Sequence, residues 1–219
     1  MRVVLTGTDT SSRPLAEVLE AAGFEVETCP LVAVEALPGP PLRAAKYDWL
    51  LLTSRNAVEP LLDRLEGELP RVAVVGLGTA EALRARGVEP DLVARASTQE
   101  GLAAELPRPA GRVLFAGAEG ARDVLLRELG ADFVPLYRTV ALRPQRFPAG
   151  DLVVLASPSA ARAFAALGLA LPCVSIGPVT SAAARSLGLR VASEAETHDR
   201  EGLSEAVKLA ASTAGSSPS

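Results

Sequence analysis

The chain has 219 residues, of which 48% are hydrophobic and 22% are charged, and its formal net charge is −4. This composition predicts a folded protein with a real core, and the length allows one large domain or two small ones. The negative charge disfavours nucleic-acid binding, and no apolar run approaches the roughly 20 residues that a membrane span needs. The N-terminal residues lack the pattern of a secretory signal, so we expect a cytoplasmic protein.

Cysteine and histidine usage narrows the chemistry. Cys29 and Cys173 lie on apolar segments without a Cys or His at metal-ligand spacing, which predicts buried thiols rather than a disulfide or a zinc site. His198 is the only histidine and lies in a polar segment. This disfavours a His-rich metal centre and a Ser-His-Asp hydrolase. We therefore expect no metal ion.

In chain order, five short and almost wholly apolar segments predict strands that are buried on both faces of a parallel sheet. They are RVVLTG (2–7), DWLLLTS (48–54), RVAVVG (71–76), RVLFAG (112–117) and DLVVLAS (151–157). Each runs into Gly or Ser and then into a helical pattern. The clearest helices are predicted at 14–22, 79–86, 121–129 and 181–187, each followed by a glycine that can end it. This alternation indicates an α/β fold.

The sequence also repeats itself. Residues 72–106 align with 174–207 at an offset of 101, so that four residues of the first segment match four of the second. These are Gly76, Thr79, Gly87 and Gly101, matched by Gly177, Thr180, Gly188 and Gly202. More loosely, FEVETCPLVAVEAL (24–37) answers ADFVPLYRTVAL (131–142). The chain is therefore predicted to contain two copies of one α/β unit.

Two Pro- and Gly-rich stretches, EALPGPPLRAAK (35–46) and LRPQRFPAG (142–150), indicate breaks within the fold. The small and polar residues 211–219 predict a disordered tail.

Polar residues follow two of the predicted strands at matching places. LLLTSRNAV (50–58) carries Ser54 and Asn56, and VVLASPSAARAF (153–164) carries Ser157 and Ser159. Ligands of doubly wound sheets bind at the carboxyl ends of strands, where helix N-termini present free N–H groups. Each serine either caps its helix alone or caps it and also faces a ligand. If the two rims faced each other across a cleft, they would form one large anion-binding site.

A nucleotide site is the weaker interpretation of VVGLGTA (74–80). Gly76 and Gly78 follow a strand and open a helix, but Glu81 replaces the third glycine of a dinucleotide fingerprint. No phosphate-loop Lys-Ser/Thr pattern exists in the sequence.

Tyr137, in VPLYRTV, is one of only two tyrosines. It is either a half-buried aromatic with a solvated hydroxyl or a functional donor. Arginines occur at helix starts and in the segment around Tyr137. Solvation explains most such residues, but any that face a ligand would pair with carboxylates in forked geometry. The arginines at helix starts and around Tyr137 are Arg13, Arg55, Arg122, Arg138 and Arg162.

Taken together, these segments resemble uroporphyrinogen-III synthases. The matching stretches are DWLLLTSRNAV, VAVVGLGTAEALRARG, STQEGLAAEL, GARDVLLRELG with VPLYRTV, VLASPSAARAF and SIGPVTSAAARSLG, which cover nearly the whole chain. No one motif is diagnostic, but their order and spacing are specific. One departure is that the first strand ends in Thr6-Gly7, where the family usually has Thr-Arg.

The resemblance implies two flavodoxin-like, parallel-sheet domains of the α/β class, joined by a two-stranded β connection. It places residues 1–35 and 144–210 in one discontinuous domain and residues 38–140 in the other. Tyr137 would then lie at the hinge.

The resemblance also implies an activity in tetrapyrrole biosynthesis. A uroporphyrinogen-III synthase is a cofactor-free lyase that cyclises hydroxymethylbilane with inversion of ring D through a spiro intermediate. Tyr137 would assist loss of the substrate hydroxyl as a proton donor. Substrate contacts are expected from Ser54, Asn56, Thr79, Ser157, Ser159, Thr180, Arg13 and Arg122. We expect a monomer that binds neither nucleic acid nor membrane, and a direct hand-over from hydroxymethylbilane synthase is left open.

Two other classes of function remain. A non-catalytic two-domain binding protein shares the predicted architecture, although periplasmic examples carry a signal peptide. A nucleotide-using two-domain transferase is the other, and it predicts stabilisation by a nucleotide.

Overall fold

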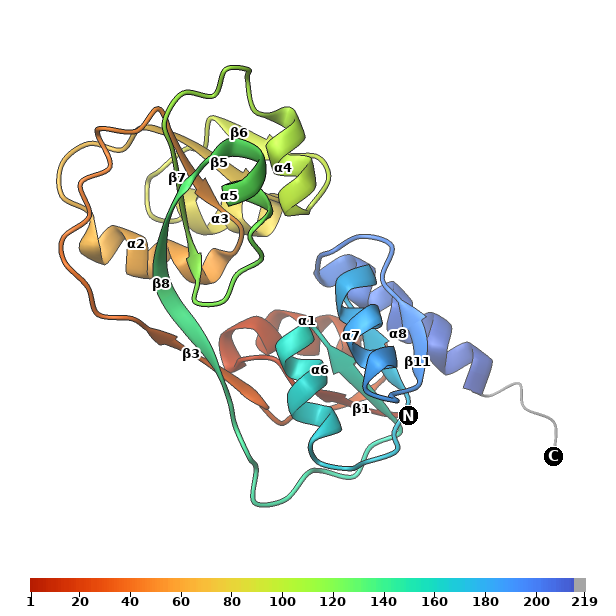
Figure 1. The fold of residues 1–219 in the computed structure, drawn as a ribbon. Helices are drawn as coiled ribbons and strands as arrows, with labels where there is room; N and C mark the ends of the chain where they lie inside the picture. The colour runs from red at the N-terminus through yellow and green to blue at the C-terminus, as the bar shows by residue number, and fades with distance from the viewer. Residues whose placement is uncertain (215–219) are drawn as a thin grey trace. The chain divides into compact units, whose positions relative to one another are not determined.

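A computed structural model describes residues 1–214, and Figure 1 traces them along the chain. The chain forms two α/β units. Unit 1 comprises Met1–Ala33 and the chain from Val140 onward, and unit 2 comprises Val34–Thr139. We propose that these units are the two domains of the protein, with limits a few residues from the expected 35, 38, 140 and 144.

Unit 1 contains a five-stranded parallel sheet in the order β11-β10-β9-β1-β2. Its strands are β1 (Arg2–Leu5), β2 (Glu25–Thr28), β9 (Leu152–Leu155), β10 (Cys173–Ser175) and β11 (Val191–Glu194). Its helices are α1 (Asp9–Ala21), α6 (Pro158–Ala165), α7 (Pro178–Ser186) and α8 (Arg200–Ala214). Alternate side chains of the central strands pack on opposite faces, which explains why these strands read as continuous apolar runs. Val3 packs with α1 and α8, and Val4 packs with α6 and α7.

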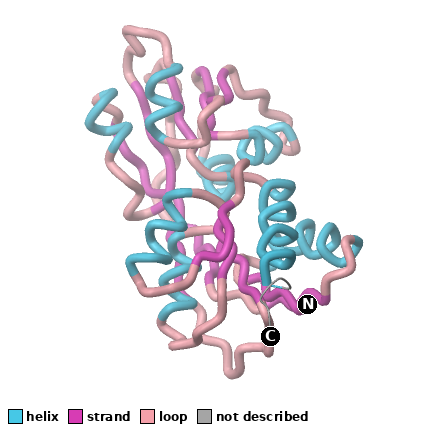
Figure 2. The backbone as a smooth tube through the Cα atoms, turned by 90° about the vertical axis from the view of Figure 1, so that its right-hand side faces the viewer, coloured by secondary structure: helices cyan, strands magenta, loops and turns pink. Residues whose placement is uncertain are grey.

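Unit 2 has the same layered arrangement, with helices on both faces of the strands (Figure 2). Its strands are β4 (Trp49–Leu52), β5 (Arg71–Val75), β6 (Leu92–Ala94) and β7 (Val113–Ala118), to which β3 (Val32–Ala36) and β8 (Asp132–Ala141) are added. Its helices are the short 3-10 helix η1 (Arg55–Ala57), α2 (Val58–Arg64), α3 (Leu77–Arg84), α4 (Gln99–Glu105) and α5 (Val124–Leu129). Leu50 packs on the face of α2 and α3, and Leu51 packs on the face of α4 and α5.

Strands β3 and β8 carry the chain between the two units and are neighbours in the second sheet (Figure 1). The amide of Leu37 donates to Leu136 and the amide of Leu142 donates to Leu31, each at 2.8 Å. From residue 31 to residue 37 on the first segment, the hydrogen-bond partners run from residue 142 back to residue 136 on the second. The two segments are therefore antiparallel. The two-stranded β connection that the resemblance implied is therefore present.

The order of the strands explains the sequence repeat. Unit 1 has the flavodoxin-like order when its strands are numbered along the chain. Unit 2 reads β8-β7-β4-β5-β6, which is the same spatial order with β7 and β8 in the places that β1 and β2 take in unit 1. Strands β4, β5 and β6 therefore correspond to β9, β10 and β11, which confirms the two-copy prediction and makes unit 2 a circular permutation of unit 1.

The predicted helices all occur, but three of them begin earlier than expected and α5 begins later, at Val124 rather than at residue 121. Helix α3 begins at Leu77 rather than at residue 79. Helix α1 begins at Asp9 rather than at residue 14, because the Thr8 side chain accepts the N–H of Ser11. Helix α7 begins at Pro178 rather than at residue 181, and proline suits a first helical position. The apolar period that guided the prediction starts only after these caps. At the other end, Gly130 ends α5 in the left-handed conformation with φ 61°, as predicted.

The last helix extends further toward the C-terminus than the sequence predicted. Helix α8 continues to Ala214, so residues 211–214 are helical, and the prediction of a disordered tail from residue 211 was wrong for them. Their Ala, Ser and Thr residues extend a helix whose inner face already packs on the sheet. Residues 215–219 lie outside the described part of the chain.

Cys29 and Cys173 are buried free thiols, as predicted, and burial raises the pKa of Cys173 to about 11.

Candidate active site

Strand β4 ends at the residue pair that the sequence singled out. The Ser54 hydroxyl oxygen accepts a hydrogen bond of 3.2 Å from the backbone N–H of Asn56 and so caps η1. Capping by Ser54 is therefore confirmed, as both alternatives for this serine required. Since the oxygen accepts this bond, the hydroxyl proton remains free to be donated elsewhere. The Asn56 side chain is exposed beside it.

Tyr137 lies on β8, in register with Ala118 of the neighbouring strand, three residues before the chain passes back into unit 1. It is only 5% exposed, so the half-buried alternative was wrong. Burial raises the pKa of the Tyr137 phenol, and a side-chain hydrogen bond with Ser54 opposes this rise. The structure thus brings Ser54 and Tyr137 together and keeps the phenol in its protonated form near neutral pH.

The start of helix α3 also lies at the carboxyl edge of the unit 2 sheet, which we call the rim of unit 2. Gly76 caps the helix with φ 73°, a backbone conformation that favours glycine, and a Cβ there would stand 2.8 Å from the Ser97 hydroxyl. At Gly78 a Cβ would stand 3.2 Å from Cζ of Arg55, because the guanidinium lies directly on this turn. Thr79 is buried in the same turn. Free N–H groups, a guanidinium and a hydroxyl therefore gather where β5 ends.

Arg122 has a carboxylate partner. Its guanidinium donates to both oxygens of Glu100, at 2.5 and 3.0 Å. This pairing lowers the pKa of Glu100 and raises the pKa of Arg122. A substrate carboxylate would therefore have to compete with Glu100 for this arginine, which the sequence did not indicate.

The equivalent rim of unit 1 carries the remaining candidates. Ser157 accepts the N–H of Ala160 at 3.1 Å and caps α6, in the manner of Ser54. Ser159 accepts a 3.3 Å hydrogen bond from Arg162. Thr180 is buried in the first turn of α7, and Arg13 is exposed on α1. Ser157, Ser159 and Thr180 thus lie where β9 and β10 end, at the edge that faces ligands in doubly wound folds.

Sequence reasoning missed two residues that occupy the same place in the repeat. Ser97 lies against Gly76 in unit 2, and the His198 ring lies against Gly177 in unit 1, so that a Cβ on Gly177 would stand 2.6 Å from its Cδ2. They are separated by the repeat offset of 101 residues. Extending the alignment by its spacing rather than by residue identity would have paired them.

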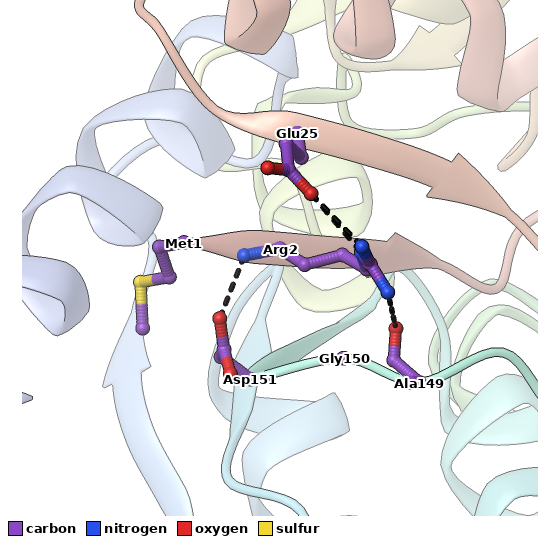
Figure 3. Close-up of a pocket in the computed structure, with 6 residues that line it drawn as sticks. All are labelled: Met1, Arg2, Glu25, Ala149, Gly150 and Asp151. Atoms are coloured by element: carbon purple, nitrogen blue, oxygen red, sulfur yellow. Dashed lines mark hydrogen bonds and ion pairs between the residues drawn. The ribbon is translucent and has the colours of Figure 1, made fainter.

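A separate hollow of about 290 Å³ lies at the opposite edge of the unit 1 sheet (Figure 3). The Arg2 amide donates to Asp151 at 2.7 Å, and its guanidinium pairs with Glu25 at 3.1 Å. These groups satisfy one another at the amino ends of β1 and β9, away from the helix N-termini. We therefore place the candidate site at the carboxyl edges and not in this hollow.

Across the described residues, no three His, Cys, Asp or Glu side chains gather as ligands for a metal ion. Within residues 1–214, no helix is long and apolar enough to cross a membrane.

Comparison with known proteins gives the family. The model of the family described as uroporphyrinogen-III synthase HemD matches residues 13–205. The chain belongs to the uroporphyrinogen-III synthase family. The family model spans the candidates of both rims, and the resemblance inferred from the sequence is confirmed.

Individual relatives agree with this. A uroporphyrinogen-III synthase from Synechococcus elongatus is 29% identical, and the match covers 94% of each chain. Two solved structures share the fold. A mutant uroporphyrinogen III synthase from Thermus thermophilus is 18% identical with a TM-score of 0.63, covering 97% of this chain and 99% of that chain. A uroporphyrinogen-III synthetase from Helicobacter pylori is 20% identical with a TM-score of 0.67, covering 97% and 100%.

Proposed function

We propose that this protein cyclises hydroxymethylbilane to uroporphyrinogen III with inversion of ring D, as a cyclising lyase of tetrapyrrole biosynthesis. The observation that carries the proposal is the family match over residues 13–205, together with a relative of the same name matched over 94% of both chains. The buried phenol and the helix N-termini at the strand ends suit this chemistry.

The first step is loss of the terminal hydroxyl of the substrate. We assign the proton for this step to Tyr137: the phenol gives its proton to the leaving oxygen, the carbon–oxygen bond breaks and water departs. The pyrrole nitrogen of ring A supplies the electron pair and gives up its own proton to solvent, which leaves a neutral azafulvene, and the phenolate regains a proton from solvent. Ser54 supports the transfer by donating a hydrogen bond from its hydroxyl to the phenol oxygen, which stabilises the phenolate as it develops.

The second task is selection of the carbon that bonds. Ring D attacks the azafulvene through its substituted carbon, and the resulting spiro intermediate fragments and closes with ring D inverted. The same substrate closes unaided to the uninverted isomer, so the enzyme must favour one geometry over another. We propose that each rim binds carboxylates of the substrate through helix N-terminal N–H groups and hydroxyls. The contacts assigned to substrate are Ser54, Asn56, Thr79, Ser157, Ser159, Thr180, Arg13 and Arg122.

Isomer analysis tests the function. Hydroxymethylbilane is incubated with and without the protein, the products are oxidised to porphyrins, and isomers I and III are separated by chromatography. We expect isomer III to predominate with the protein and isomer I without it. A product that is all isomer I in both samples would refute the proposal.

Thermal unfolding separates the two rival functions. A nucleotide-using transferase would be stabilised by ATP or NAD, whereas we expect a shift in Tm with uroporphyrinogen III and none with either nucleotide. Stabilisation by uroporphyrinogen III without any isomer III formation would favour the binding-protein alternative. We further propose that the protein acts as a cytoplasmic monomer without a cofactor, and that hydroxymethylbilane synthase supplies its substrate.

A further inference from the structure

Large apolar side chains are exposed in the first turns of two equivalent helices. Leu77, the first residue of α3, is 65% exposed, and Val179, the second residue of α7, is 49% exposed. A single exposed leucine is ordinary on a protein surface. Here an exposed apolar side chain recurs in the first helical turn of both copies, one residue after Gly76 and two residues after Gly177, at the edge where ligands of such sheets bind.

The surroundings of Leu77 carry positive charge. The Arg55 guanidinium lies on the adjacent Gly78, and none of the described acidic side chains pairs with it. The N-terminus of α3 adds its own positive potential at the same place. Two positive features side by side repel each other, and an anion held between them would relieve this. An apolar side chain next to an unpaired guanidinium is complementary to a flat apolar ring whose edge carries carboxylates.

We propose that Leu77 packs against a pyrrole face of the tetrapyrrole substrate while Arg55 binds one of its carboxylates. This inference rests on the proposed function and names how the rim recognises the ring system. A pyrrole bearing carboxylate side chains presents both surfaces at once, whereas hydroxyls and N–H groups alone would leave the ring faces in water. Holding a ring by its face also restricts its rotation, which the choice between isomers requires.

The test compares Leu77→Ser with Leu209→Ser. Leu209 is 58% exposed on α8 and serves as the matched control. Burying most of a leucine side chain on binding predicts that Leu77→Ser raises KM about threefold to tenfold and lowers the ratio of isomer III to isomer I at low substrate. Leu77→Met should restore both values, and Leu209→Ser should match the wild type.

Arg55→Gln tests the charged half of the proposal. We expect its KM to be raised and to depend less on salt than that of the wild type, whereas Leu77→Ser should keep the full salt dependence. Equal KM and isomer ratio in Leu77→Ser and Leu209→Ser would overturn the inference, provided that the Tm of both variants matches the wild type. A wild-type protein that forms no isomer III would instead refute the proposed function, so the two failures are distinguishable.

Discussion

At the scale of single residues, Ser54 caps a helix and keeps a hydroxyl proton that it can still donate. Its oxygen accepts the Asn56 N–H, which satisfies one of the orphan donors of η1. The hydroxyl proton remains available, and we propose that Ser54 uses it to hold the Tyr137 phenol, whose pKa burial raises and a side-chain hydrogen bond with Ser54 lowers. The short polar break after strand β4 thus has a structural reason, and its proposed chemical use is open to test.

The phenol proton can be tested directly. We expect Tyr137→Phe to lower kcat about 100-fold or more, because positioned acid catalysis is worth at least that factor. Steady-state turnover and the isomer III to isomer I ratio are the measurements. Tyr47→Phe is the control, because Tyr47 is the only other tyrosine and its hydroxyl donates to Asp132 at 2.8 Å on the opposite edge of the sheet. Unchanged kcat and isomer ratio in Tyr137→Phe would remove its proposed role.

Ser54 provides a second readout for the same prediction. Ser54→Ala should lower kcat in the wild-type background but cause little further loss when Tyr137 is already Phe, because the two residues act as a unit. Additive losses would show that Ser54 contacts the substrate independently of Tyr137.

At the scale of elements, the equivalent helices α4 and α8 of the two copies begin with the same kind of cap. Thr98 accepts the N–H of Gly101 at 3.0 Å before α4, and Asp199 accepts the N–H of Gly202 at 2.8 Å before α8. Glycine is needed because a Cβ at Gly101 would stand 2.5 Å from the carbonyl oxygen of Ala96. The matching of Gly101 with Gly202 in the sequence therefore reflects a cap geometry and not a ligand contact.

This cap predicts a stability effect. Thr98→Ala should lower the free energy of unfolding by about 1 kcal/mol, because the Gly101 N–H loses its acceptor. Thr98→Ser keeps the hydroxyl and should lie close to the wild type. Urea unfolding followed by circular dichroism is the measurement, and equal midpoints for Thr98→Ala and the wild type would contradict the assignment.

At the scale of the whole molecule, each unit has its own core. Phe164 is fully buried between the unit 1 sheet and its helices, and Trp49 is buried within unit 2. Because the two cores are buried separately, we expect the two units to unfold in separate transitions.

The only tryptophan makes this testable, because Trp49 reports on unit 2. We expect Phe164→Ala to lower the free energy of unfolding of unit 1 by about 3–5 kcal/mol. The part of the circular dichroism transition that reports unit 1 should then shift to lower denaturant, while the midpoint of the Trp49 fluorescence transition stays unchanged. Phe115→Ala, on the core that contains Trp49, is the reciprocal variant and should move the fluorescence midpoint itself. Coincident shifts of both probes in Phe164→Ala would show that the units unfold together.

Local signals in the sequence determined most of the fold of this protein. Doubly buried strands, helix stops such as Gly130 and the polar residues after β4 and β9 were readable because each depends on a few neighbouring residues. The two-copy organisation followed from identical residues that recur at one constant offset. Helix starts such as Asp9 were missed because capping by Thr8 precedes the apolar period.

Only the tertiary structure decided which distant residues meet. The permuted strand order places β8 beside β7 and so brings Tyr137 to Ser54, and the same folding pairs Arg122 with Glu100 and sets Ser97 against Gly76. Such contacts depend on how strands separated along the chain are ordered in a sheet, and no pattern within a short segment encodes that order. The candidate residues could therefore be chosen from the sequence, whereas the sheet topology decided which of them lie together.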